Sequence, residues 1–252
     1  DRVVDPWEAF LERWPTAEAL ATADRSEVVS FWSAHRLGYN NRARYLHEAA
    51  RQIVEDFDGQ FPTSPDSLQA LQGVGPYTSN AVASFAFDDG DAVVDTNVKR
   101  VLHRAFDIPD DDDAFEQVAE QLMPEDQSRI WNNAIMELGG VICGQTPRCD
   151  AGPCPWRDRC RAYRTGDFTA PDVPSQPEFE GSRRQFRGRV VRTLATRGPL
   201  TLDALGPLVR VDYSPDGDPG EDWLLDLLDD LADDGLVAIE EGETDPMVRL
   251  RR

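Results

Sequence analysis

Four cysteines fall within one 18-residue window, and they offer the most recognisable chemistry of the chain. They stand at Cys143, Cys149, Cys154 and Cys160, separated by five, four and five residues. Thiols gathered in this way in a reducing compartment favour a metal site over disulfides. Four thiolates can hold a 4Fe-4S cluster or a structural zinc ion, and the paired CxxC knuckles of most zinc sites are missing. The spacing therefore favours an iron–sulfur cluster, with zinc and then two disulfides as alternatives.

Arginines crowd the same cysteine segment. Such a loop could present cations to phosphate groups while a metal centre fixes its shape, or the arginines could simply balance nearby carboxylates. They are Arg148, Arg157, Arg159, Arg161 and Arg164.

A glycine turn at residues 71–78 joins two expected helices. Gly73 and Gly75 flank Val74, and Pro76 and Tyr77 begin the next helix. Glycines permit the positive φ of a tight turn, and free N–H groups at a helix start can bind an anion such as a DNA phosphate. An isolated Gly-x-Gly of this kind is more often an ordinary corner between helices.

Asp95 follows the apolar run at residues 92–94 and stands where a helix is expected to begin. Most aspartates in that position only cap the helix. A carboxylate there could also stabilise positive charge that develops on a sugar ring, as in glycoside hydrolysis.

The elements that must position these residues are short amphipathic helices with apolar residues three and four apart. A proline-rich linker is expected at 166–182, and the acidic run at 110–113 is expected to be a loop. We therefore predict a mainly α fold with domains at 1–165 and 183–252, the second being a winged-helix-like α+β unit. Helices are expected at 6–14, 17–23, 26–35, 42–57, 67–71, 77–87, 114–123, 129–139, 185–195, 201–209 and 221–234, and strands at 235–239 and 247–250.

The chain carries a net charge of −21, and Lys99 is its only lysine among 26 basic residues. An acidic chain argues against a nucleic-acid partner, which prefers a basic face. A lysine-poor, acid-rich composition is instead typical of proteins from cells with molar internal salt, where the Debye length is only about 3 Å. We interpret the charge as halophilic adaptation. Apolar runs of membrane-spanning length and a signal peptide are both missing, so the sequence predicts a cytoplasmic protein.

In the order hairpin, aspartate and cysteine cluster, the chain resembles the iron–sulfur branch of the helix-hairpin-helix DNA glycosylases, which includes endonuclease III. It is most similar to the MutY-type adenine DNA glycosylases. The resemblance covers roughly residues 1–165 and rests on residues 37–39, 42–46, 73–78, 94–102 and 133–143.

The resemblance implies roles for matching positions. Asp95 would stabilise an oxocarbenium-like sugar, and Asn97 would position the nucleophile or Asp95. Tyr77 stands where bifunctional lyases carry a Schiff-base lysine, so a monofunctional enzyme is implied. Tyr39 would wedge into the DNA stack beside a flipped base. DNA contacts are expected at Gly73, Val74, Gly75, Lys99 and Arg100, and the 4Fe-4S ligands would be Cys143, Cys149, Cys154 and Cys160.

Three features depart from the family pattern. The family's catalytic glutamate lies in a segment before Asp1, so we expect that the chain continues upstream, as the missing initiator Met also suggests. The usual cysteine spacing is six, two and five residues. A winged-helix-like unit also replaces the Nudix-like domain that reads the oxidised guanine.

The sequence thus predicts a hydrolase of base excision repair that removes adenine mispaired with 8-oxoguanine or guanine. A thymine or uracil mismatch glycosylase is one alternative, and a non-catalytic, cluster-bearing DNA-binding regulator is another. The expected partner is double-stranded DNA with a mismatched or damaged base pair, bound by a monomer at the nucleoid. Arginines at the start of the last domain could follow a DNA backbone or pair with carboxylates: Arg183, Arg184, Arg187, Arg189, Arg192 and Arg197.

Overall fold

The computed structural model describes residues 3–152, 154–172, 177–242 and 245–252. Its contacts divide the chain into two compact units, residues 1–61 with 176–252, and residues 62–175. The domain boundaries at 165 and 183 stay a prediction. None of the helices in the described ranges is both long and apolar enough to cross a membrane.

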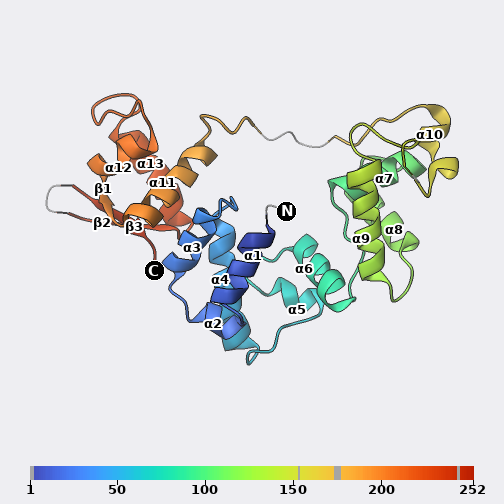
Figure 1. Cartoon of the computed structure of the whole chain (residues 1–252), viewed down its shortest axis with the longest axis horizontal. Helices are drawn as coiled ribbons and strands as arrows, with labels where there is room; N and C mark the ends of the chain where they lie inside the picture. Colours follow the sequence, from blue (N-terminus) through green and yellow to red (C-terminus); the bar gives the residue numbers. More distant parts are fainter. Residues whose placement is uncertain (1–2, 153, 173–176, 243–244) are drawn as a thin grey trace. The chain divides into compact units, whose positions relative to one another are not determined.

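The first unit joins four N-terminal helices to the C-terminal helices and strands through one apolar core. Val28 and Val29 of the N-terminal part and Val190 and Leu194 of the C-terminal part are buried in the same cluster. The C-terminal segment is therefore not packed as an isolated module. The helices are α1 (Val4–Arg13), α2 (Ala17–Ala21), α3 (Arg25–Ala34), α4 (Asn41–Asp56), α11 (Arg183–Arg197), α12 (Leu202–Val209) and α13 (Glu221–Asp233) (Figure 1).

A small antiparallel sheet completes this unit. Strand β3 (Met247–Leu250) lies between β1 (Leu200–Thr201) and β2 (Val237–Glu240). Val248 is opposite Leu200 on one side and Ile239 on the other. The sequence predicts only the hairpin of β2 and β3. The third strand has two residues, which is too short for a pattern of alternating polarity to reveal it.

In the described residues of the second unit, all regular secondary structure is helical. Its core gathers around Phe115, Leu102 and Ile135, all at most 2% exposed. Its elements are α5 (Pro65–Gln69), α6 (Pro76–Val82), the π-helical turn η1 (Ala83–Phe87), α7 (Thr96–Phe106), α8 (Asp112–Leu122), α9 (Ser128–Glu137), the π-helical turn η2 (Leu138–Ile142), the 3-10 turn η3 (Arg157–Arg159) and α10 (Arg161–Thr165) (Figure 1).

Side-chain caps explain where several helices begin. Ser64 accepts a hydrogen bond from Ser67 N with Pro65 in the first turn of α5, and Thr201 caps α12. Both satisfy N–H groups that a helix start leaves without partners. The expectation of a loop at 110–113 is wrong in part. Asp111 caps α8, and Asp112 and Asp113 form its first turn, where the helix dipole favours carboxylates.

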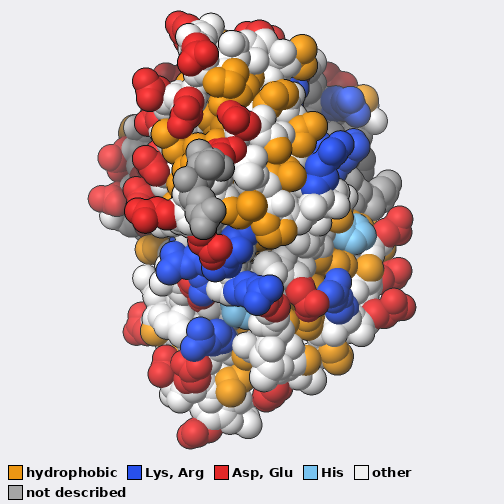
Figure 2. Space-filling view, turned by 90° about the vertical axis from the view of Figure 1, so that its left-hand side faces the viewer, with side chains coloured by type: hydrophobic (Ala, Val, Ile, Leu, Met, Phe, Trp, Pro, Cys, Tyr) orange, Lys and Arg blue, Asp and Glu red, His pale blue; other side chains and the backbone are white. Residues whose placement is uncertain are grey.

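Charge is unevenly distributed over the surface. On the face shown in Figure 2, carboxylates crowd the upper left and the lower part, whereas basic side chains gather across the middle. The net charge of −21 therefore does not describe every part of the surface.

Candidate active site and cysteine cluster

Asp95 caps helix α7 and is fixed there by three donors. Its Oδ1 accepts hydrogen bonds from Asn97 N and Val98 N, both at 2.8 Å, and its Oδ2 accepts one from Asn97 Nδ2 at 2.9 Å. The side chain is half-buried. The cap holds the carboxylate in one orientation while each oxygen keeps lone-pair capacity, so capping is compatible with the chemical role predicted for Asp95.

Tyr77 lies within the electrostatic reach of Asp95, although 17 residues separate them in the sequence. Partial burial, and then the negative charge of Asp95, raise the pKa of Tyr77. The phenol is therefore a neutral hydroxyl near pH 7, and about half of the side chain is exposed. The fold brings the first residues of α6 and the start of α7 to one place.

The turn before α6 is built by a single left-handed glycine. Gly73 has φ +78°, whereas Gly75 has an extended backbone that any residue can adopt. Val74 N donates to Leu71 O at 3.1 Å, so this N–H closes the turn. Among the N–H groups of this turn, that of Val74 is therefore used by the turn itself, and DNA contact by Gly73, Val74 and Gly75 stays a prediction.

Arg100 connects Asn97 to the chain that leads into the cysteine segment. Its Nη2 donates to Asn97 Oδ1 and to Gly139 O, each at 2.8 Å, and its Nε donates to Cys143 O at 2.7 Å. Asp95, Asn97, Arg100 and the backbone around Cys143 thus form one hydrogen-bonded series. The Lys99 ammonium is paired with the Asp112 carboxylate. DNA contact by Lys99 and Arg100 stays a prediction.

Arg104 is a site residue that the sequence did not reveal. It is 3% exposed, and its guanidinium donates to the carbonyl oxygens of Gly144 at 2.6 Å, Gln145 at 3.1 Å and Phe168 at 3.0 Å. It therefore fixes both ends of the cysteine segment to α7. Nothing in its spacing distinguishes this arginine from a surface residue.

All four cysteines line one small cavity and are free thiols. Burial, and then the nearness of Cys154, Cys143 and Cys160, raise the pKa of Cys149, so the four thiols lie close together. In the described residues, no three His, Cys, Asp or Glu side chains are arranged to hold a single metal ion. Four thiolates that share one cavity are the donor set that either a 4Fe-4S cluster or a structural zinc ion requires.

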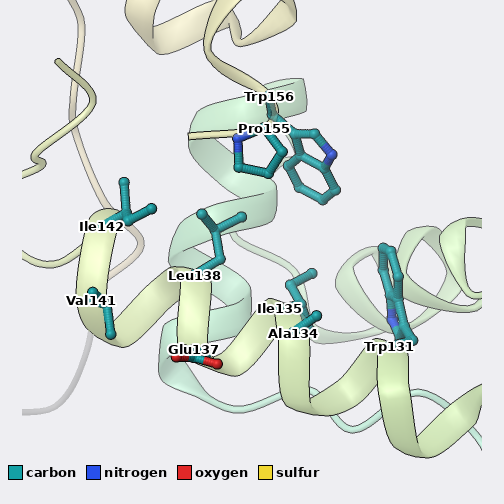
Figure 3. Close-up of a pocket in the computed structure, with 9 residues that line it drawn as sticks. All are labelled: Trp131, Ala134, Ile135, Glu137, Leu138, Val141, Ile142, Pro155 and Trp156. Atoms are coloured by element: carbon teal, nitrogen blue, oxygen red, sulfur yellow. The ribbon is translucent and has the colours of Figure 1, made fainter. Parts of the chain in front are cut away.

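Aromatic packing fastens the cysteine loop to the helices. The Trp156 ring lies 5.3 Å from that of Phe106 and 6.3 Å from that of Trp131. Beside it, an apolar groove of about 370 Å³ runs along α9 and η2, and Pro155 and Trp156 form part of its wall (Figure 3). Neither Tyr77 nor Asp95 lines this groove, so it is not part of the candidate active site.

Two of the loop arginines balance nearby carboxylates, and phosphate binding by the others stays a prediction. Arg157 pairs with Asp158 and Arg161 with Asp167. Ion pairs are not found for the other three in the described part of the chain, namely Arg148, Arg159 and Arg164.

The wedge residue predicted in the first unit lies in a strained turn. Tyr39 has φ +46° and is 53% exposed, and the Arg42 guanidinium lies 5.0 Å from its ring centroid. Trp32 Nε1 donates to Gly38 O at 2.6 Å and so holds the turn. Positive φ at a bulky residue is costly, and such strain tends to persist at functional sites.

The helical fold with a hairpin, a capping aspartate and a four-cysteine loop defines a base excision DNA glycosylase. Residues 1–125 match the family model of the HhH-GPD superfamily base excision DNA repair proteins. The chain is 38% identical over 251 residues to an adenine DNA glycosylase of Mycolicibacterium smegmatis, which covers 96% of this chain and 84% of that protein. It belongs to the adenine DNA glycosylase family.

Other relatives extend the comparison. An adenine DNA glycosylase of Rattus norvegicus is 39% identical over 187 residues, covering 71% of this chain and 36% of that protein. Among solved structures, a thermostable thymine-DNA glycosylase has a TM-score of 0.59 and 29% identity, over 65% of this chain and 77% of that one. A non-covalent endonuclease III–DNA complex has a TM-score of 0.56 and 25% identity, over 64% and 76%.

Proposed function

We propose that this protein removes adenine from DNA where it is mispaired with 8-oxoguanine or guanine. The observation that carries the proposal is the Asp95 carboxylate, held by three donors at the start of α7 and within electrostatic reach of Tyr77. The sequence identity of 38% to an adenine DNA glycosylase over 96% of the chain supports adenine as the base that is removed. The protein would act as a monomer on double-stranded DNA at the nucleoid.

The reaction is hydrolysis of an N-glycosidic bond. The bond between C1′ and the base breaks, its electron pair leaves with adenine, and water supplies hydroxide to C1′ and a proton to the base. Asp95 faces the positive charge that develops on the sugar, and a fixed carboxylate in a partly desolvated site stabilises that charge most strongly. Tyr77 offers no amine for an imine, so the DNA strand stays intact after base release.

We further propose that the cysteines hold a 4Fe-4S cluster. The supporting observations are the cavity that all four cysteines line and the similarity of the chain to adenine DNA glycosylases. When bound, the cluster would supply structural support by fixing the loop between α9 and α10. Arg104 and Arg100 would hold the backbone of that loop against α7. The ligands are Cys143, Cys149, Cys154 and Cys160.

Duplexes with a single defined mispair test the function. The full-length protein is mixed in excess with DNA that carries adenine opposite 8-oxoguanine, adenine opposite guanine, or thymine opposite guanine. We expect release of adenine from the first two duplexes, and strand cleavage only after alkali treatment. Release of thymine but not adenine would instead assign the protein to the mismatch glycosylases, whose fold it shares.

A further inference from the structure

A groove of about 740 Å³ lies within the first unit, outside the candidate active site. One wall is the turn between α3 and α4, and the other is helix α11. The second wall lies beyond residues 1–125, the part that matches the superfamily model. The lining residues that carry the argument are Arg36, Tyr39, Arg184, Arg187, Gly188 and Arg192.

The charge of the groove is opposite to that of the chain. The chain has 47 acidic and 26 basic residues, so a random surface would carry nearly two carboxylates for each basic group. The groove lining instead contains four arginines and neither aspartate nor glutamate, although the charge of one of the four, Arg187, is balanced by Asp234 outside the lining. A local reversal of this kind in an acidic protein indicates a site for an anion.

Helix α11 carries arginines that pair with carboxylates of α13 and its C-terminal cap and arginines that line the groove, and Arg187 does both. Arg183 pairs with Asp226, and Arg187 with Asp234, so these two serve packing against α13. Arg192 is exposed and has no ion pair in the described residues. Arg184 stacks over Phe179 at 5.2 Å, which keeps its guanidinium at the groove.

The spacing along α11 suits an extended anion. Arg184, Gly188 and Arg192 are four residues apart and therefore lie on one face, with about 12 Å of helix axis between the two arginines. A Cβ placed on Gly188 would meet no atom within 4 Å, so packing does not require a glycine there. Its missing side chain leaves the groove open between the two cations, so a strand could lie close to the helix.

We propose that this groove binds the phosphodiester backbone of duplex DNA, so that α11 extends the DNA interface beyond the superfamily domain. The occupant must be a polyanion longer than a single phosphate, because the cations are spread along the helix. The exposed Tyr39 ring at the other wall also offers a face on which a base can stack. The inference rests on the proposed function only in the choice of DNA as the polyanion.

Two sets of substitutions in the full-length protein test the groove. The first is Arg192→Ala, with Arg197→Ala as its control, because Arg197 is an exposed arginine of the same helix that does not line the groove. The second is Gly188→Gln, which fills the groove without changing charge, with Gly188→Ala as its control. Duplex Kd is measured by fluorescence anisotropy over a series of KCl concentrations, and base release is measured under single-turnover conditions with saturating protein.

We expect Arg192→Ala to weaken duplex binding roughly tenfold and to lower the slope of log K against log salt by about 0.9, the value for one lost phosphate contact. Arg192→Lys should restore most of the affinity. Gly188→Gln should weaken binding without changing helix content by circular dichroism, and both controls should match the wild type. The rate of base release at saturation should not change, because Asp95 is untouched.

Unchanged Kd and salt slope in both Arg192→Ala and Gly188→Gln would overturn the proposal, as would an equal loss in Arg197→Ala. Binding of vesicles that contain anionic phospholipid, with no effect of the substitutions on DNA binding, would assign the groove to a lipid surface instead. Failure of the wild type to release adenine would refute the proposed function only, since the binding readout uses an undamaged duplex.

Discussion

At the scale of single residues, the site depends on how one carboxylate is held. Asp95 accepts from two backbone N–H groups and from Asn97 Nδ2, and Asn97 in turn accepts from Arg100. Each of these contacts is local to the first turn of α7. The cap can therefore be predicted from the sequence. Only the electrostatic influence of Asp95 on Tyr77 distinguishes this capping aspartate from those of other helices.

We expect Asp95→Asn to lower the single-turnover rate of adenine release by about 10²- to 10³-fold, because the charge that stabilises the sugar is lost. Asparagine is as good a cap as aspartate, so the melting temperature should change little. Asp111→Asn is the matched control, since it neutralises the cap of the next helix. Similar losses in both variants would contradict a special role for Asp95.

The substitution Cys149→Ser tests whether the four cysteines hold an iron–sulfur cluster. Removal of one of four thiolates should cost most of the bound iron and sulfide, measured by chemical assay, and should lower the melting temperature because binding of a structural metal centre is coupled to folding. Zinc content is measured in the same samples. A wild type that contains one zinc and no iron would refute the iron–sulfur assignment.

At the scale of elements, helix α7 and the turn η2 approach closely enough to exclude a side chain. A Cβ on Gly139 would lie 2.8 Å from Asn97 Cβ and 3.0 Å from Asn97 O. The neighbouring Gly140 has open space around it. The contact explains how Arg100 reaches Gly139 O, and it makes Gly139 a positioning residue for the start of α7.

Gly139→Ala should therefore destabilise the protein by about 1–3 kcal/mol, the usual cost of overpacking, and should slow base release by displacing Asn97. Gly140→Ala should change stability by less than about 0.5 kcal/mol. Urea denaturation and single-turnover kinetics of the two variants make the comparison. Equal stability of both variants would show that α7 and η2 can separate at little cost.

Helix α4 carries a buried histidine whose titration links stability to pH. His47 is 4% exposed, and its Nε2 lies 3.0 Å from Ala23 O. Burial mainly lowers the pKa of His47 below 6.5. The positive charges of Arg25 and Arg51 act in the same direction, whereas the Ala23 carbonyl and Glu48 oppose them. The folded state thus prefers the neutral ring.

Because the unfolded chain binds the proton more readily, stability should be complete above pH 6.5 and should fall as the pH drops below that value, by at most about 1.4 kcal/mol per unit. Melting temperatures between pH 7.5 and 5.5 measure this slope. His47→Gln keeps a donor for Ala23 O but does not titrate, so its slope should be smaller. An equal slope in both proteins would assign the effect to other groups.

At the scale of the whole molecule, a net charge of −21 in 252 residues implies strong self-repulsion at low salt. The Debye length falls from about 10 Å at 0.1 M to about 3 Å at 1 M salt. We therefore expect the melting temperature to rise with KCl across this range, by roughly 2–4 °C for each kcal/mol of repulsion that is screened. An unchanged or falling melting temperature would count against the halophilic interpretation.

Most helices were predictable because their signals are local. Apolar residues three and four apart place α5 and α11 within a few residues of their observed bounds, and Asp95 marks the start of α7. The short elements β1 and α10 were missed, since two and five residues carry too little pattern.

The sequence by itself determined the helical class, the family, and the residue types that can do chemistry. Only the tertiary structure decided which of them come near one another: Tyr77 within electrostatic reach of Asp95, Arg100 bonded to the backbone at Gly139 and Cys143, and α11 packed in the core of the N-terminal helices. The physical reason is the sequence separation over which each kind of interaction acts. Capping and periodicity act over three or four residues, whereas these contacts join residues far apart in the chain and depend on how complete helices pack.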